Sequence, residues 1–132
     1  GPDDEFWAVI DYDRWGDKKM SEIIQQAFQK GYHVAVSRLC FEAWLLLHWI
    51  PKSDITEEML LDFNEKSCEE IASEIRKIQG HYKKDLNDVV EYVERAEIAI
   101  ENARSLDVNP VDRWPRTFGS RVYQICERIR KE

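Results

Sequence analysis

The chain has 132 residues, of which 43% are hydrophobic and 34% are charged, and its formal net charge is −7 at pH 7. This length is typical of one domain with its own core, and the composition excludes collagen-like, low-complexity and disordered chains. No uncharged apolar stretch reaches the length of a membrane span, and the acidic balance argues against nucleic-acid binding driven by net charge alone. We expect a single domain over residues 1–132 with no membrane partner. Its first five residues are expected to be a disordered start, because Gly1-Pro2 is typical of a cleaved tag.

The three cysteines, Cys40, Cys68 and Cys126, are an odd number without paired spacing. This pattern is unlike the disulfide frameworks of small secreted domains. The start of the chain also lacks the basic and apolar pattern of a secretion signal. We therefore expect no disulfide framework and a reducing, cytoplasmic environment.

The first predicted element is a strand over residues 6–10 (FWAVI), an apolar run rich in aromatic and β-branched residues. It ends in the acidic Asp11-Tyr12-Asp13. A polar loop is expected over residues 14–19, where Asp17 can cap the next helix.

The next elements complete a strand–helix–strand unit. Apolar residues recur with helical spacing over residues 20–28, and Gly31 is placed to end that helix. Residues 33–37 (HVAVS) predict a second strand. Two strands joined by one helix over this length are expected to be parallel, with their carboxyl ends at the same edge of the sheet.

The rest of the chain is predicted to be helical. Residues 40–49 are apolar nearly all round, which indicates a buried helix that stops before Pro51. Further helices are expected from Thr56 to Gly80, from Asp85 to about residue 103, and over residues 122–129. The predicted fold is thus α/β and mostly helical, with a βαβα core over residues 6–50 and a helical region over 51–132. Two strands form a thin sheet, and its exposed edge favours a homodimer.

Asp11 and Asp13 are the first candidates for a functional site. Residues two apart on a strand point to the same face, so their carboxylates repel each other unless a cation lies between them. Hard oxygen ligands of this kind suit Mg²⁺ or Mn²⁺, and ligands in parallel α/β sheets bind at the carboxyl ends of strands. The alternative is that Asp13 caps a turn and that Asp11 is a solvated residue at a strand end.

Glu42 is a carboxylate in an otherwise apolar helix, where it must be paired, hydrogen-bonded or metal-bound. If the two strands are parallel, Glu42 lies at the same edge of the sheet as Asp11 and Asp13. The alternative partner is a basic group such as Arg38. His48 lies on a different face of that helix and is expected to be a hydrogen-bonded core histidine.

Basic and aromatic residues outside the core are the remaining candidates. His81-Tyr82-Lys83-Lys84 contains lysines that can contact phosphate, or it is a solvated basic turn between acidic helices. Trp15 and Trp114 lie in predicted loops and are candidates for base stacking or for contact with a partner. The segments GxGxxG, GxxxxGK[ST] and GxSxG do not occur.

Several ordered segments together resemble the RloB-like family, a bacterial group with a Toprim-type fold found in restriction and phage-defence loci. FWAVIDYD is similar to the family's apolar strand that ends in Asp-x-Asp, and SRLCFEAWLLLHW, from Ser37 to Trp49, is similar to its Ser-Asn-Pro-Cys-Phe-Glu-x-Trp-Leu-Leu-Leu-His-aromatic block. Weaker matches follow at residues 82–84 and 99–104. The resemblance covers most of residues 6–104, and the Cys-Phe-Glu block is its specific part.

The resemblance implies a Mg²⁺ or Mn²⁺ centre that cuts nucleic-acid phosphodiesters. Toprim-type enzymes use a glutamate from an early strand and an Asp-x-Asp from a later one. Asp11 and Asp13 match the latter, and Glu42 matches the family's helix glutamate, as a further ligand or an orienting group. The resemblance also implies further roles: phosphate or nucleic-acid contacts by Lys83, Lys84 and Arg38, and supporting positions for Ser37, His48 and Tyr82.

The sequence departs from the family pattern in three places. The early-strand glutamate has no match, Arg38-Leu39 replaces Asn-Pro, and Pro115-Arg116-Thr117 only loosely follows a Pro-Ser-Thr-type segment. The leading hypothesis is therefore a metal-dependent nuclease of DNA or RNA in anti-phage defence. The alternatives are a non-catalytic module that docks on a partner such as an ATPase subunit, and a scaffold whose carboxylates serve only as caps.

Overall fold

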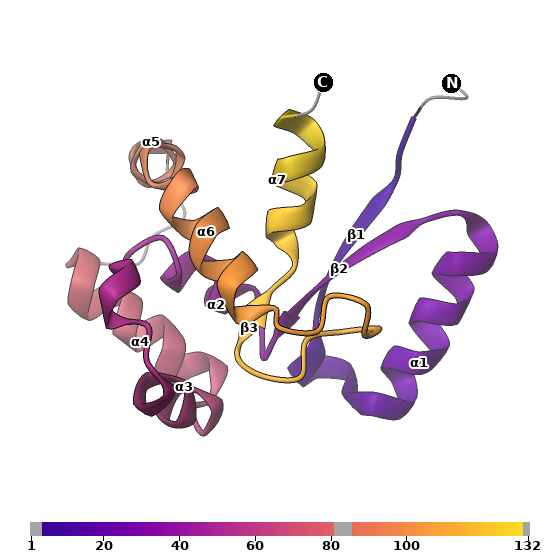
Figure 1. The fold of residues 1–132 in the computed structure, drawn as a ribbon, viewed down its shortest axis with the longest axis horizontal. Helices are drawn as coiled ribbons and strands as arrows, with labels where there is room; N and C mark the ends of the chain where they lie inside the picture. The colour runs from indigo at the N-terminus through magenta and orange to yellow at the C-terminus, as the bar shows by residue number, and fades with distance from the viewer. Residues whose placement is uncertain (1–3, 81–85, 131–132) are drawn as a thin grey trace.

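The computed structural model describes residues 4–80 and 86–130, and it is an α/β fold in which helices cover a small sheet (Figure 1). Within these residues no helix is both long enough and apolar enough to cross a membrane. The strands are β1 Trp7–Asp11, β2 His33–Arg38 and β3 Gly119–Ser120. The helices are α1 Tyr12–Lys30, α2 Phe41–Leu46, α3 Glu57–Asn64, α4 Cys68–Gln79, α5 Leu86–Glu94, α6 Ala96–Leu106 and α7 Val122–Arg130, with a short 3-10 turn at Lys52–Asp54.

The parallel strand pair is confirmed. β1 and β2 run side by side from Trp7 opposite His33 to Asp11 opposite Ser37. A third strand, β3, was not predicted. It adds to β2 in the antiparallel direction, with Ser37 opposite Ser120, and the sheet order is β1-β2-β3. Two residues are too short to show the alternation that predicts a strand, so this pairing depends on the packing of the whole chain.

The predicted loop over residues 14–19 was wrong. α1 begins at Tyr12, directly after β1, and only Gly16 departs from helical geometry, with φ 72° and ψ 172°. Glycine has no Cβ and adopts this conformation readily, so the helix kinks at Gly16 instead of starting beyond it. Gly31 ends α1 as predicted, in the left-handed conformation, and the N–H of Tyr32 donates to the carbonyl of Ala27.

Three predicted helices proved shorter or divided. The helix expected over residues 40–49 covers only α2, and turns follow it. The helix expected from Thr56 to Gly80 divides into α3 and α4. Thr56 caps the first through the N–H of Met59, and Ser67 with Glu70 forms a capping box that starts the second. The helix expected to continue to residue 103 divides at Arg95 into α5 and α6.

Helices cover both faces of the sheet, and Figure 1 shows α1 on one side of the strands and α2 to α6 on the other. Ala35 on β2 belongs to the larger core, which α2, α4, α6 and α7 complete, whereas the next residue, Val36, packs with Met20 of α1. Successive strand residues point to opposite faces, which explains this division. Trp114 belongs to the α1 side and is only 5% exposed, so the prediction of an exposed, stacking Trp114 was wrong.

Cys40 and Cys68 form a disulfide that joins the start of α2 to the start of α4. The sequence analysis, which expected no disulfide framework, did not foresee this single bond, and Cys126 is the free thiol. The two cysteines are 28 positions apart, and no local pattern relates them. They meet because α2 packs against α4, which is a tertiary contact.

Candidate functional site

The carboxyl end of β1 is held against the start of α2. Asp11, the last residue of β1, is half-buried, and its Oδ1 accepts the N–H of Phe41 at 2.9 Å. The N–H of Asp13 donates to the carbonyl of Leu39 at 2.8 Å. These two bonds fix the Asp11-Tyr12-Asp13 turn against the segment that joins β2 to α2.

Asp11, Asp13 and Glu42 lie close enough to influence one another. Burial raises the pKa of Asp11 above its ordinary value, and the charges of Glu42 and Asp13 raise this pKa further. The N–H of Phe41 and the guanidinium of Arg14 oppose this shift. The parallel sheet brings Asp11 to the edge where α2, which carries Glu42, begins. Asp13 lies in the first turn of α1 and not on β1, so the expectation that the two aspartates share one face of a strand was wrong.

In this structure Asp11, Asp13 and Glu42 do not converge on one point as the ligands of a metal ion would. Within residues 4–80 and 86–130, no group of three or more His, Cys, Asp or Glu side chains is arranged to hold a metal ion. The exposed side chain of Asp13 turns towards the disulfide, where its Oδ2 lies 3.6 Å from Sγ of Cys68. By chemistry the donors fit Mg²⁺ or Mn²⁺, because they are hard oxygens and a cation would relieve their mutual repulsion.

Arg38 and Ser37 come from the end of β2, beside Asp11. The guanidinium of Arg38 lies over the ring of Tyr12, with Cζ 4.1 Å from the centroid, and Nη1 donates to the carbonyl of Pro115 at 3.4 Å. Arg38 therefore lies next to the Asp11-Tyr12-Asp13 turn. Ser37 is fully buried, and its Oγ lies 2.7 Å from Oγ of Ser120. Ser37 thus joins β2 to β3.

His48 is a core residue. It is 4% exposed, and Nδ1 lies 2.9 Å from the carbonyl of Trp44, so the proton is assigned to Nδ1. The rings of Trp44 and Tyr92 meet the imidazole edge-on at 4.9 Å. Burial lowers the pKa of His48, which keeps the ring neutral. The basic candidates Tyr82, Lys83 and Lys84 lie outside the described residues.

A cavity beside Asp11 is the feature that the sequence argument missed. It has a volume of about 320 Å³, and its walls are Val9, Ile10, Asp11, Arg14, Trp15 and Ile23. Trp15 was a candidate for base stacking from the sequence. Because it was predicted to lie in a loop, its position beside β1 could not be predicted. Because α1 begins at Tyr12, its first turns carry Arg14 and Trp15 to the cavity.

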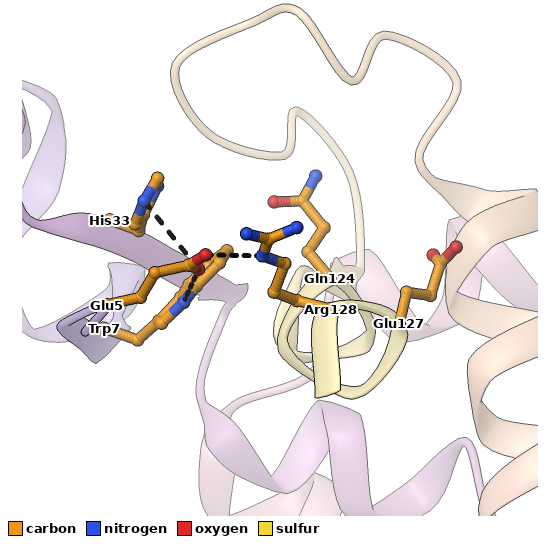
Figure 2. A pocket seen from close by; sticks show the side chains of 6 residues that line it. All are labelled: Glu5, Trp7, His33, Gln124, Glu127 and Arg128. Carbon is orange, nitrogen blue, oxygen red and sulfur yellow. Dashed lines mark hydrogen bonds and ion pairs between the residues drawn. The ribbon is translucent and has the colours of Figure 1, made fainter. Parts of the chain in front are cut away.

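A second cavity, of about 400 Å³, lies at the other end of the strands (Figure 2). Trp7 and His33, the first residues of β1 and β2, stack there with ring centroids 4.7 Å apart. Glu5 accepts from Nε1 of Trp7 and from Arg128 of α7, and Oε1 lies 4.0 Å from Nε2 of His33. Glu127 pairs with Arg104 at 2.9 Å. The charged groups of this cavity thus have protein partners, and they tie α7 to the strands.

Comparison with known proteins places the chain in a family. The family model for RloB-like protein matches residues 1–129. No curated protein and no solved structure matches the chain. Because the match covers nearly every residue, the chain belongs to the RloB-like family.

Proposed function

We propose that this protein cleaves nucleic-acid phosphodiesters with the help of a divalent metal ion, as Toprim-type nucleases do, in bacterial anti-phage defence. The observation that carries the proposal is the position of Asp11 at the carboxyl end of β1 and of Asp13 just after it in the first turn of α1, with Glu42 near enough to raise the pKa of Asp11. Ligands of parallel α/β sheets bind at this edge. Membership of the RloB-like family agrees with this proposal, since the family's resemblance to Toprim proteins suggested the same residues.

In this proposal Asp11, Asp13 and Glu42 hold Mg²⁺ or Mn²⁺. A cation bound there would activate a water molecule and stabilise the charge that develops on the phosphate. Arg38 lies beside the Asp11-Tyr12-Asp13 turn, where its guanidinium can bind a phosphate oxygen. Lys83 and Lys84 are proposed as further phosphate contacts, from outside the described residues.

Calorimetric titration with Mn²⁺ tests the metal site. We expect the wild type to bind Mn²⁺, and we expect the Asp11→Asn/Asp13→Asn double variant to lose that binding. Asp62→Asn is a matched control, because Asp62 lies on α3 with a side chain 64% exposed. Cleavage of single- and double-stranded DNA and RNA is measured beside it. Full cleavage by the double variant, or no Mn²⁺ binding by the wild type, contradicts the proposal.

A second candidate function is a module that docks on an ATPase subunit. Three apolar side chains of α5 favour it: Val89, Val90 and Val93 are 52%, 53% and 69% exposed. Apolar residues gathered on one helix commonly mark a protein interface. Replacing Val90 and Val93 with glutamate is expected to abolish binding to an ATPase subunit of a defence complex, while Mn²⁺ binding is kept. Equal binding of that ATPase subunit by the wild type and the variant contradicts this candidate.

A further inference from the structure

The cavity beside Asp11 joins an open strand edge to an aromatic ring. Val9 and Ile10 are neighbours on β1, so their side chains point to opposite faces of the sheet, and a cavity lined by both reaches around the strand edge. Within the described residues β1 pairs only with β2. The backbone N–H and C=O groups on the other edge of β1 therefore have no strand partner and lie on the side of the cavity. They can form hydrogen bonds with the polar edge of a planar ligand.

Trp15 and Arg14 supply the other wall. Trp15 is 39% exposed, and Cζ of Arg14 lies 5.2 Å from the centroid of its ring. Val9, which is 48% exposed, adds an apolar surface. An aromatic face with a guanidinium beside it is the combination that binds the bases and phosphates of single-stranded nucleic acid.

We propose that this cavity binds one unpaired nucleobase against Trp15, so that the substrate of the carboxylate site is single-stranded nucleic acid. This inference rests on the proposed function and names its substrate class. A volume of about 320 Å³ suits one heterocycle rather than a protein helix. Asp11 forms part of the cavity wall, so a base held there brings its own phosphodiester near Asp11. Bases paired within a duplex cannot enter the cavity.

Binding of short oligonucleotides tests the inference. The probe is a fluorescent single strand of twelve nucleotides, compared with the same strand carrying abasic sites and with its duplex, in Ca²⁺ buffer. Stacking of one base changes affinity by roughly 5- to 150-fold. We expect Trp15→Ala to weaken binding of the intact strand by about 10-fold, to the level of the abasic strand, and we expect Trp15→Phe to keep most of it.

Phe28→Ala is the matched control, because Phe28 is an aromatic residue of the same helix that is 84% exposed and lies outside the cavity. This variant is expected to bind like the wild type. Trp15→Leu keeps apolar bulk without an aromatic face, and it replaces Trp15→Ala if the latter does not fold. Equal binding by the wild type and by a folded Trp15→Ala or Trp15→Leu variant overturns the inference, and it favours a partner strand at the edge of β1 instead. Equal affinity for the intact and abasic strands, or for the single strand and the duplex, also overturns it.

Mn²⁺ titration of the same variants separates this inference from the proposed function. Trp15→Ala is expected to bind Mn²⁺ like the wild type, because Trp15 contributes no carboxylate. If the wild type binds no Mn²⁺ but Trp15→Ala loses base-dependent binding, the cavity inference stands and the nuclease proposal fails. If Mn²⁺ binds but the bases of the strand have no effect, the nuclease proposal stands and the cavity inference fails.

Discussion

At the scale of single residues, a buried cluster of polar contacts surrounds Asp107. Its carboxylate pairs with Nε of Arg121 at 3.2 Å, and the two side chains are only 5% and 6% exposed. The hydroxyl of Tyr123 donates to Oδ2 of Asp107 at 2.6 Å. Arg121 also donates to the carbonyls of Asn109 and Asp112. The cluster satisfies a buried charge pair and closes the loop that leads from α6 to β3.

Because of this cluster, the free energy of unfolding is expected to fall as the pH rises into the alkaline range. Burial and donation to Asp107 raise the pKa of Tyr123 to about 12, whereas the unfolded tyrosine titrates near pH 10. Between these values the folded state holds a proton that the unfolded state releases, so the free energy of unfolding falls as pH rises. We expect a loss of about 1–2 kcal/mol between pH 10 and 12 from this group, measured by urea denaturation.

Tyr123→Phe is the control for that measurement. It removes the titrating hydroxyl, so its unfolding free energy should lack this group's part of the alkaline decline. At pH 7 the variant should be less stable by about 1–2 kcal/mol, because a carboxylate loses a buried hydrogen bond. The same alkaline decline in both proteins would assign it to other groups.

Gly16 decides how α1 is attached to β1. Its φ of 72° and ψ of 172° lie in a region that is nearly restricted to glycine, although a Cβ there would meet no neighbouring atom within 4 Å. We expect Gly16→Ala to lower the free energy of unfolding by about 1–3 kcal/mol through backbone strain alone. Lys18→Ala, an exposed change in the same helix, should have little effect in the same denaturation experiment. An unchanged Gly16→Ala protein would show that α1 straightens at little cost.

At the scale of elements, the Cys40–Cys68 disulfide links α2 to α4 beside the candidate site. It closes a loop of 28 positions, which restricts the unfolded chain and is worth about 3.6 kcal/mol in the loop-entropy description. Reduction with dithiothreitol, or the Cys40→Ser/Cys68→Ser double variant, is therefore expected to lower the midpoint of thermal unfolding. Cys126→Ser, which removes the free thiol, should unfold like the wild type and keep its response to the reductant.

At the scale of the whole molecule, Ser37 and Ser120 join the two halves of the chain. Their hydroxyls lie 2.7 Å apart and are buried, and Oγ of Ser120 also accepts the N–H of Val122. Each single change to alanine leaves the other, buried hydroxyl without this partner, and it is expected to lower the free energy of unfolding by about 1–3 kcal/mol. The double variant should lose less than the sum of the single losses, because the pair is removed together. Strict additivity in urea denaturation would contradict this coupling.

The local elements of this fold were predictable from the sequence. Runs of apolar and β-branched residues placed β1 and β2, helical spacing placed the second half of α1, and Thr56 and Gly31 marked helix ends correctly. The position of Asp11 at the end of a strand followed from the same patterns, whereas Asp13 proved to lie in the first turn of α1. The predicted helix boundaries were wrong where one local pattern is compatible with two arrangements of helices. The apolar face from Met59 to Ile78 suits one helix or two, and the capping box at Ser67 decides for two.

The sequence by itself determined the parallel strand pair and the edge at which its carboxylates lie, because hydrophobic spacing and helix caps depend on residues only a few positions apart. Only the tertiary structure decided the pairing of β3 with β2, the disulfide between Cys40 and Cys68, the burial of Trp114 and the placement of Trp15 beside Asp11. These features join segments that are distant along the chain or depend on how α1 leaves β1. They form because several helices pack on both faces of one small sheet, and that packing has no counterpart in local sequence patterns.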